Sequence, residues 1–430
     1  MKRIKKILNS TITFQQLLLS GGVTFLYRIL GLFLNFLITF FITKNYGAGV
    51  YGNFSLVFTI LQASTMIFAL GLPNAVINYL GLHKIDDHFS QYLLKKGVKI
   101  ILITAIIPSA LFYILKDVIA IDVFHNKNLI SYIIIISVTL PFFIIQEFFL
   151  NFLIATKSFI KFNIFMFVVP NLLFLVLLVF ISITKENQFF TILYYAVSVA
   201  ITVVIESFIV FKKHIKEEID KLTSKQILQF SSPMMLSSLM LFLLNWTDVL
   251  MLGAMKSEEE VGIYNLAYKL ASLSMLVIIS MNVVLAPKIS QLFKSGKIEE
   301  LHTTIKKSTR LIILLTTPIV LFLIVFSEFI LSLFGNNFTA GKTALIIISL
   351  GAMINVTTGN VDQILNMTNH QHILKNITVF GFVLNVVLNY LLIPIYGING
   401  SALASLFTNT VFNLICLYYI KRKLGFYTFL

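Results

Sequence analysis

Charged side chains lie inside the apolar stretches of this sequence, and their chemistry is the most informative feature of the chain. Arg28 and Lys269 each fall well inside an apolar run, Asp248 and Asp362 also lie inside such runs, and Glu206 lies near the end of one. A charge near the middle of a bilayer costs roughly 2.5–3.5 kcal/mol, so such a residue usually faces a water-filled cavity or a charged partner. Cations in a cavity would bind an anionic group, whereas carboxylates would bind a proton or a metal cation.

Each of these residues also has a purely structural interpretation. The flexible stems of Arg28 and Lys269 could carry their charges to the membrane surface, and Lys269 could pair with Asp248. Glu206 is within reach of Lys212 or Lys213, close to the end of its run. Both interpretations stay open at the level of sequence.

Polar residues in several apolar runs recur three, four or seven positions apart, so they share one face of a helix. The stripes of the first and seventh runs contain Asn35 and Asn245, and those of the second and eighth contain Gln62 and Asn265. Serine, threonine and asparagine often join neighbouring helices by hydrogen bonds. Long stripes in four runs, however, predict a hydrated central cavity lined by these residues together with the two cations.

The composition sets the class of protein that must position these residues. Of the 430 residues, 58% are hydrophobic and 12% are charged, whereas soluble domains carry about 25% charged residues. The chain is therefore predicted to be an all-α integral membrane protein, because hydrocarbon leaves no partner for free backbone groups. The single cysteine, Cys416, excludes a disulfide framework and a cysteine metal site, and it is expected to be a packing residue.

Twelve apolar runs are long enough to cross a bilayer of ~30 Å as helices. They are expected near residues 20–43, 50–72, 98–115, 129–155, 163–184, 189–211, 229–253, 262–286, 309–334, 342–366, 374–394 and 398–420.

The positions of the basic residues predict the orientation of these helices. Most of the 33 lysine and arginine residues lie in alternate gaps, which places both termini in the cytoplasm. This placement explains the net charge of +15, so no nucleic-acid partner is expected. The basic gap divides the chain into an N-terminal six-helix lobe (1–211), a cytoplasmic linker (212–228) and a C-terminal six-helix lobe (229–430). The lobes are predicted to be parallel repeats about a pseudo-twofold axis along the membrane normal. A shift of 210 residues supports the repeat, because it places Gly52 on Gly262.

Catalytic, cofactor and metal signatures are missing from the sequence. The segment from Gly335 to Thr343 approaches a phosphate-binding loop, but it has five residues between its glycines instead of four. His370 and His372 have no further ligands nearby in the sequence. The sequence therefore predicts no metal, no cofactor and no enzyme active site.

Several short motifs spread along the chain resemble those of the bacterial O-antigen and capsule repeat-unit flippases (Wzx-like). That family belongs to a larger group with the multidrug antiporters and the lipid-linked peptidoglycan-precursor flippases. The motifs are Ser20-Gly21-Gly22 with Arg28 and Gly31, Tyr46-Gly47, Tyr51-Gly52-x-Phe54, Asp248-x-x-Met251-Leu252-Gly253, Val261-Gly262-Ile263-Tyr264-Asn265, Ala286-Pro287-Lys288-Ile289, and the stretch from Ile393 to Ala402.

The resemblance implies a twelve-helix, two-lobe transporter of the bacterial plasma membrane that works by alternating access. Its substrate would be an undecaprenyl-type pyrophosphate-linked oligosaccharide, moved from the inner to the outer leaflet for assembly of surface polysaccharide. Membrane lipids and polysaccharide polymerase machinery are the further partners that it suggests. By the same resemblance, Arg28 and Lys269 would meet the pyrophosphate. Exchange of a proton or sodium ion through Asp248, Asp362 or Glu206 is left open.

Two other functions compete with this one. A cation-coupled antiporter for small drugs or metabolites would use the same fold, but it needs an acidic central pocket, whereas Arg28 and Lys269 favour an anion. A membrane-bound glycan polymerase or ligase would be expected to carry a large outward loop. The longest predicted outer loops are short, and this is the least favoured function.

Overall fold

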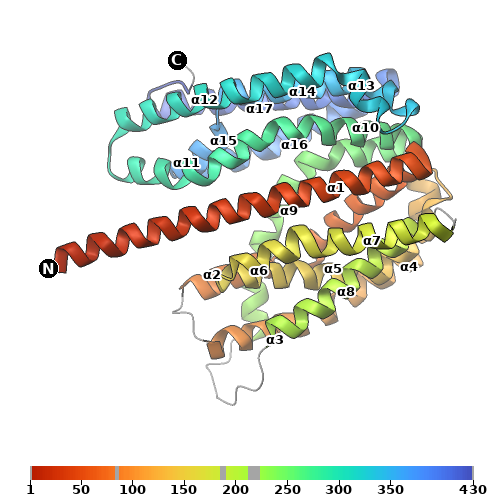
Figure 1. Cartoon of the computed structure of the whole chain (residues 1–430), viewed down its shortest axis with the longest axis horizontal. Coiled ribbons are helices and arrows are strands. Elements are labelled where there is room, and N and C mark those ends of the chain that lie inside the picture. Colours follow the sequence, from red (N-terminus) through yellow and green to blue (C-terminus); the bar gives the residue numbers. More distant parts are fainter. Residues whose placement is uncertain (1, 83–86, 185–189, 212–222, 429–430) are drawn as a thin grey trace. The chain divides into compact units, whose positions relative to one another are not determined.

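The computed structural model describes residues 2–82, 87–184, 190–211 and 223–428, and in these residues every regular element is a helix (Figure 1). Large apolar side chains cover much of the surface: Phe208 is 81% exposed, Ile114 72% and Ile395 71%. Apolar exposure on this scale is not found on monomeric soluble proteins. The exposed side chains therefore face lipid, and the prediction of an all-α membrane protein is confirmed.

Ten helical segments of the described chain are long and apolar enough to cross a membrane. One of them, Leu26–Phe68, is 43 residues long and contains the first two predicted spans. Helix α9 (Ser224–Met255), with 32 residues, coincides with the seventh. With these two additions the structure has about twelve spans, as predicted. The fourth span, α5 (Leu129–Ala155), begins and ends at the predicted residues.

The chain forms two compact units, and their boundaries do not follow the linear order of the sequence. The first unit contains Met1–Phe41, Leu61–Ala120 and Lys127–Ser238. The second contains Ile42–Ile60, Ile121–Asn126 and Leu239–Leu430. Most of the predicted linker (212–228) lies outside the described residues. The division into lobes at 1–211 and 229–430, and the pseudo-twofold axis between them, stay predictions.

Helix α5 is the centre of the first unit. It packs against α2 (Leu72–Leu82), α4 (Ile106–Ile114) and α8 (Phe190–Val210). Its own buried residues include Ile133, Ile144, Phe148 and Phe149, which are at most 2% exposed. A helix that is apolar on most of its surface belongs in the interior of a bundle or across a membrane. This unit also contains α3 (Asp87–Thr104), α6 (Phe159–Asn163), α7 (Val169–Thr184) and parts of α1 (Lys2–Phe68) and α9.

The second unit is a bundle in which α12 (Ile298–Val325), α14 (Lys342–Thr358) and α17 (Ile398–Leu424) lie side by side (Figure 1). Helix α16 (Gln371–Tyr396) packs along α17. The single cysteine, Cys416, is fully buried in the apolar core of this bundle, so its predicted packing role is confirmed. The other helices are α10 (Glu258–Ala271), α11 (Leu276–Lys294), α13 (Ser327–Ser332) and α15 (Val361–Met367).

Two glycines with positive φ interrupt the helical backbone, one inside α1 and one between α14 and α15. Gly47 has φ 78° inside the long helix α1 (Lys2–Phe68), and Gly359 has φ 78° at the end of α14. Glycine is the residue that adopts positive φ without steric cost. Because of the second break, Asp362 lies on the short helix α15 and not on α14, although both fall in the tenth predicted span.

Candidate functional site

A buried carboxylate is the centre of the most extensive polar cluster in the second unit. Asp248, on α9, is 3% exposed. Its Oδ2 accepts hydrogen bonds from the Tyr264 hydroxyl, at 2.7 Å, and from the Ser405 hydroxyl. Its Oδ1 accepts from the side-chain amides of Asn389, at 2.8 Å, and Asn385, at 3.2 Å. Helices α9, α10, α16 and α17 thus meet at one side chain.

The local sequence explains why these donors converge. Asn385 and Asn389 are one helical turn apart on α16, so both amides are on the face that meets Asp248. The Ser401 hydroxyl of α17 donates to Asn389 Oδ1 at 2.8 Å and orients that amide. Every donor on the Asp248 carboxylate is an uncharged group.

Uncharged donors can stabilise a carboxylate inside a membrane protein without fixing it in an ion pair. Hydrogen bonds to an ionised group contribute about 1.5–3 kcal/mol each. The cluster of Asp248, Tyr264, Asn385, Asn389 and Ser405, called here the Asp248 cluster, also contains the oxygen ligands that a small hard cation requires. Chemically, this arrangement can hold either a bound cation or a proton.

The predicted cation Arg28 lies in the first unit, on α1. It is half-buried, and its guanidinium lies 5.8 Å from the ring centroid of Phe167. Gly31, one turn further on, packs so closely there that an added Cβ would lie 2.7 Å from Phe167 Cβ. One turn before Arg28, the Thr24 hydroxyl accepts a hydrogen bond from the Asn163 amide at 2.9 Å. The predicted stripe is therefore in contact with the fifth span.

The other predicted residues divide between the two units. Asn35 and Gln62 are half-buried in the first unit, where Glu206 is fully buried. In the second unit Lys269 is half-buried, Asn245 is exposed and Asp362 is exposed on α15.

Asn265 of the second unit has a structural partner. It is 8% exposed, and its Oδ1 accepts a hydrogen bond from the Tyr51 hydroxyl at 3.0 Å. The substrate-binding and ion-coupling roles of all nine predicted residues stay predictions, as does the cavity between the predicted lobes.

The search of the sequence for charged residues and long polar stripes did not identify several residues of the Asp248 cluster. Tyr264 occurs in a family motif, but nothing in the sequence pairs it with an acid 16 residues away. The spacing of Asn385 and Asn389 was the available signal, because two amides one turn apart in an apolar run mark a polar helix face. Helix α17 shows only the weaker pattern of Ser401, Ser405 and Thr408.

A second polar cluster, also in the second unit, joins α10 to segments from early in the chain. Glu258 Oε2 accepts hydrogen bonds from the side-chain amides of Asn53, at 2.6 Å, and Asn126, at 2.7 Å. Beside it the backbones of Gly52 and Gly262 approach closely: a Cβ added to Gly52 would lie 2.8 Å from Gly262 N and would overlap Glu258 O. These contacts group residues 42–60 and 121–126 with the second unit.

Solved structures with the same arrangement of helices define the class of this protein. An inward-facing multidrug-resistance MATE-family transporter of the MOP superfamily superposes with a TM-score of 0.76 at 15% identity, over 94% of this chain and 98% of that one. The lipid II flippase MurJ, in an inward closed conformation, gives a TM-score of 0.75 at 16% identity, over 94% of this chain and 87% of that one. The protein has the MOP-superfamily fold in a multi-pass membrane chain.

Sequence comparisons identify the family. The family model described as "Polysaccharide biosynthesis protein" matches residues 15–293. The chain belongs to this polysaccharide biosynthesis protein family, and a MatE model matches residues 233–391.

Two relatives are from Haloferax volcanii. The probable low-salt glycan biosynthesis flippase Agl15 is 25% identical over 46% of this chain and 42% of Agl15. The probable flippase AglR is 26% identical over 39% of this chain and 36% of AglR. The matched regions thus span less than half of the length of either relative.

Proposed function

We propose that this protein is a flippase that moves a polyprenyl-pyrophosphate-linked oligosaccharide from the inner to the outer leaflet by alternating access, for assembly of a surface polysaccharide. The membership of the polysaccharide biosynthesis family carries this proposal. The names of Agl15 and AglR, both probable flippases, support it. The fold shared with MurJ supports the mode of action.

Arg28 is the residue proposed to contact the pyrophosphate, with Lys269 as a second cation. Arginine suits this role because its planar guanidinium binds phosphate oxygens in a bidentate manner. Arg28 is held by the face of Phe167, which orients the guanidinium without neutralising its charge. Asn35, Gln62, Asn245 and Asn265 are proposed to contact the sugars, because amides donate and accept hydrogen bonds with hydroxyl groups.

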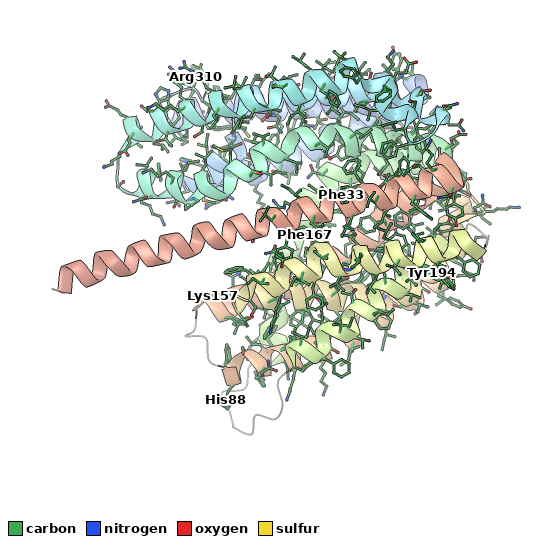
Figure 2. All side chains as sticks on the ribbon, viewed as in Figure 1. Phe33, His88, Lys157, Phe167, Tyr194 and Arg310 are labelled. Atoms are coloured by element: carbon green, nitrogen blue, oxygen red, sulfur yellow. The ribbon has the colours of Figure 1, made fainter. Side chains whose placement is uncertain are left out.

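Replacing Arg28 with alanine is expected to reduce flipping about ten- to a hundredfold, because a hydrogen bond to a charged group contributes about 1.5–3 kcal/mol. Arg28→Lys should retain part of the activity, since it keeps the charge and loses the bidentate geometry. The measurement is the flipping rate of a labelled pyrophosphate-linked oligosaccharide in proteoliposomes. Arg310→Ala is the matched control, because Arg310 is exposed on α12 (Figure 2). Undiminished flipping by folded Arg28→Ala would remove this residue from the mechanism.

The membrane potential is expected to drive the proposed reaction. Moving a pyrophosphate with about two negative charges outward, in the direction favoured by an inside-negative potential of 100 mV, releases roughly 4–5 kcal/mol. Flipping in proteoliposomes should therefore accelerate when an inside-negative potential is imposed and slow when it is reversed. An unchanged rate under both potentials would contradict electrophoretic transport.

A cation-coupled antiporter of small molecules is the second candidate function. The Asp248 cluster favours it, because a buried carboxylate surrounded by neutral donors suits a coupling cation. The same cluster serves the flippase proposal as its ion-coupling site, with Asp362 as a further candidate. Export of a cationic dye, compared with flipping of the lipid-linked oligosaccharide in the same proteoliposomes, distinguishes the two functions.

A further inference from the structure

Glu206 is a buried acid for which the described structure provides no hydrogen-bond donor. It lies in the last turn of α8, and its side chain is 0% exposed. Neither carboxylate oxygen has a hydrogen-bond partner among the described residues. A buried acid of this kind is costly in the charged form, because nothing replaces the water that it loses. The Glu206 carboxyl must therefore be either neutral or bound to a cation.

The neighbouring polar groups on α8 are already used by their own helix. The Thr202 hydroxyl, one turn before Glu206, donates to Ser198 O at 2.7 Å, and the Ser198 hydroxyl donates to Tyr195 O at 2.7 Å. One turn after Glu206, Val210 O accepts a hydrogen bond from the Gln91 amide at 2.9 Å. None of these described hydrogen bonds reaches the Glu206 carboxyl. The hydroxyls of Ser198 and Thr202 therefore have acceptors on their own helix, whereas the Glu206 carboxyl has no donor among the described residues.

A second acid is on α5, which packs along α8. Glu147 is half-buried, and its charge acts on both Glu206 and Tyr195. The Asn151 amide donates to Glu147 O at 2.8 Å and is 3.4 Å from Glu147 Oε2, so Glu147 has a polar neighbour that Glu206 lacks. Two nearby carboxyls in a site of low polarity do not both ionise, so one of them keeps a proton.

We propose that Glu206 and Glu147 form a proton-binding pair in the first unit, and that the pair takes up and releases one proton during transport. This inference rests on the proposed transport function. In the step itself, a proton from water protonates the pair when the site is open, and the pair returns the proton to water after the conformational change. The pair is separate from the Asp248 cluster, since the two lie in different units.

The surroundings favour a proton over a metal cation. A hard cation takes about six oxygen ligands, whereas a proton needs one carboxyl oxygen. The hydroxyls of Ser198 and Thr202 are bound to backbone carbonyls, and the one charged group acting on Glu206 among the described residues is Glu147. In the described part of the unit, the titratable group that acts on Glu206 is Glu147. Tyr195 lies about three turns earlier on the same face of α8, and Glu147 acts on it as well.

The direct test is infrared difference spectroscopy of the full-length protein in lipid nanodiscs during a pH titration. The wild type is expected to show the carbonyl band of a protonated carboxyl, and Glu206→Gln should lose it. Glu147→Gln should shift the pH at which the band titrates, because it removes the neighbouring charge. Glu299→Gln, at an exposed acid of α12, is the matched control and should leave the band unchanged. A band that is identical in the wild type and in Glu206→Gln would overturn the proposal.

Transport supplies the second readout. Flipping by the wild type is expected to vary with pH, and Glu206→Gln should lose most of this dependence while Glu299→Gln keeps it. Equal pH dependence in folded wild type and Glu206→Gln would contradict a coupling role. If no preparation flips the lipid-linked oligosaccharide but the infrared band still depends on Glu206, the proposed substrate fails and the proton site stands.

Discussion

Gly52→Ala is expected to destabilise the protein by roughly 1–3 kcal/mol or more, the range for overpacking at a tight contact. A Cβ at this position would overlap Glu258 O, and it would lie 2.8 Å from Gly262 N. Both obstacles are backbone atoms, so a change of side-chain rotamer cannot relieve the clash. The two helical segments would have to separate. The loss of stability should appear as a lower midpoint temperature for thermal aggregation in detergent, and size-exclusion chromatography measures this aggregation.

The matched control for this substitution is Gly351→Ala. An added Cβ at Gly351 would lie 3.4 Å from Leu406 Cδ1, an ordinary contact with the end of a flexible side chain. This variant should therefore keep the midpoint of the wild type or raise it slightly, since alanine is the better helix former. Equal midpoints for Gly52→Ala and Gly351→Ala would show that the close backbone approach at Gly52 does not exist.

The separation at Gly52 would also weaken the contacts around it. Glu258 accepts hydrogen bonds from Asn53 and Asn126, and Tyr51 donates to Asn265. These bonds join residues from early in the chain to α10 within the second unit. Adding Gly262→Ala to Gly52→Ala should cost less than the sum of the two single substitutions, because both act on the same contact. Additive losses would indicate two independent contacts.

Asp248→Ala is the second substitution with a large expected effect, on the order of 3–5 kcal/mol of destabilisation. It leaves Tyr264, Asn385 and Ser405 without their acceptor in the interior of the bundle, whereas the Asn389 amide keeps its bonds to Asn385. Each buried donor that loses its partner costs about 1–3 kcal/mol. Thermal aggregation in detergent, measured as for Gly52, reports this loss.

Two further variants separate the charge of Asp248 from its hydrogen bonds. Asp248→Asn keeps the shape and one acceptor oxygen, so it should fold with an intermediate loss of stability and should lose any dependence of flipping on the coupling cation. Ser405→Ala removes one donor and should cost about 1 kcal/mol. If Asp248→Ala were as stable as Ser405→Ala, the cluster would not contribute to the fold as its geometry indicates.

Comparison of particular residues shows how far the sequence could predict the structure. The span of α5 was predicted at both ends because an uninterrupted apolar run has one stable form in lipid, the helix. Asp362 lies on the separate helix α15 because Gly359 ends α14 with a positive φ, and a helical periodicity count cannot detect such a break. Gly52 and Gly262 fell on each other under the 210-residue shift, but the shift did not show that their backbones touch.

The sequence by itself determined the class of the protein, the number of spans and the identity of the charged residues inside them. These properties follow from the short-range rule that each backbone group in hydrocarbon must be paired within its own helix. The tertiary structure alone decided which of the buried acids has donors. Asp248 receives them from residues up to 157 positions away, whereas Glu206 receives none from the described residues. That difference depends on which helix faces meet, and neighbouring residues in the sequence do not carry this information.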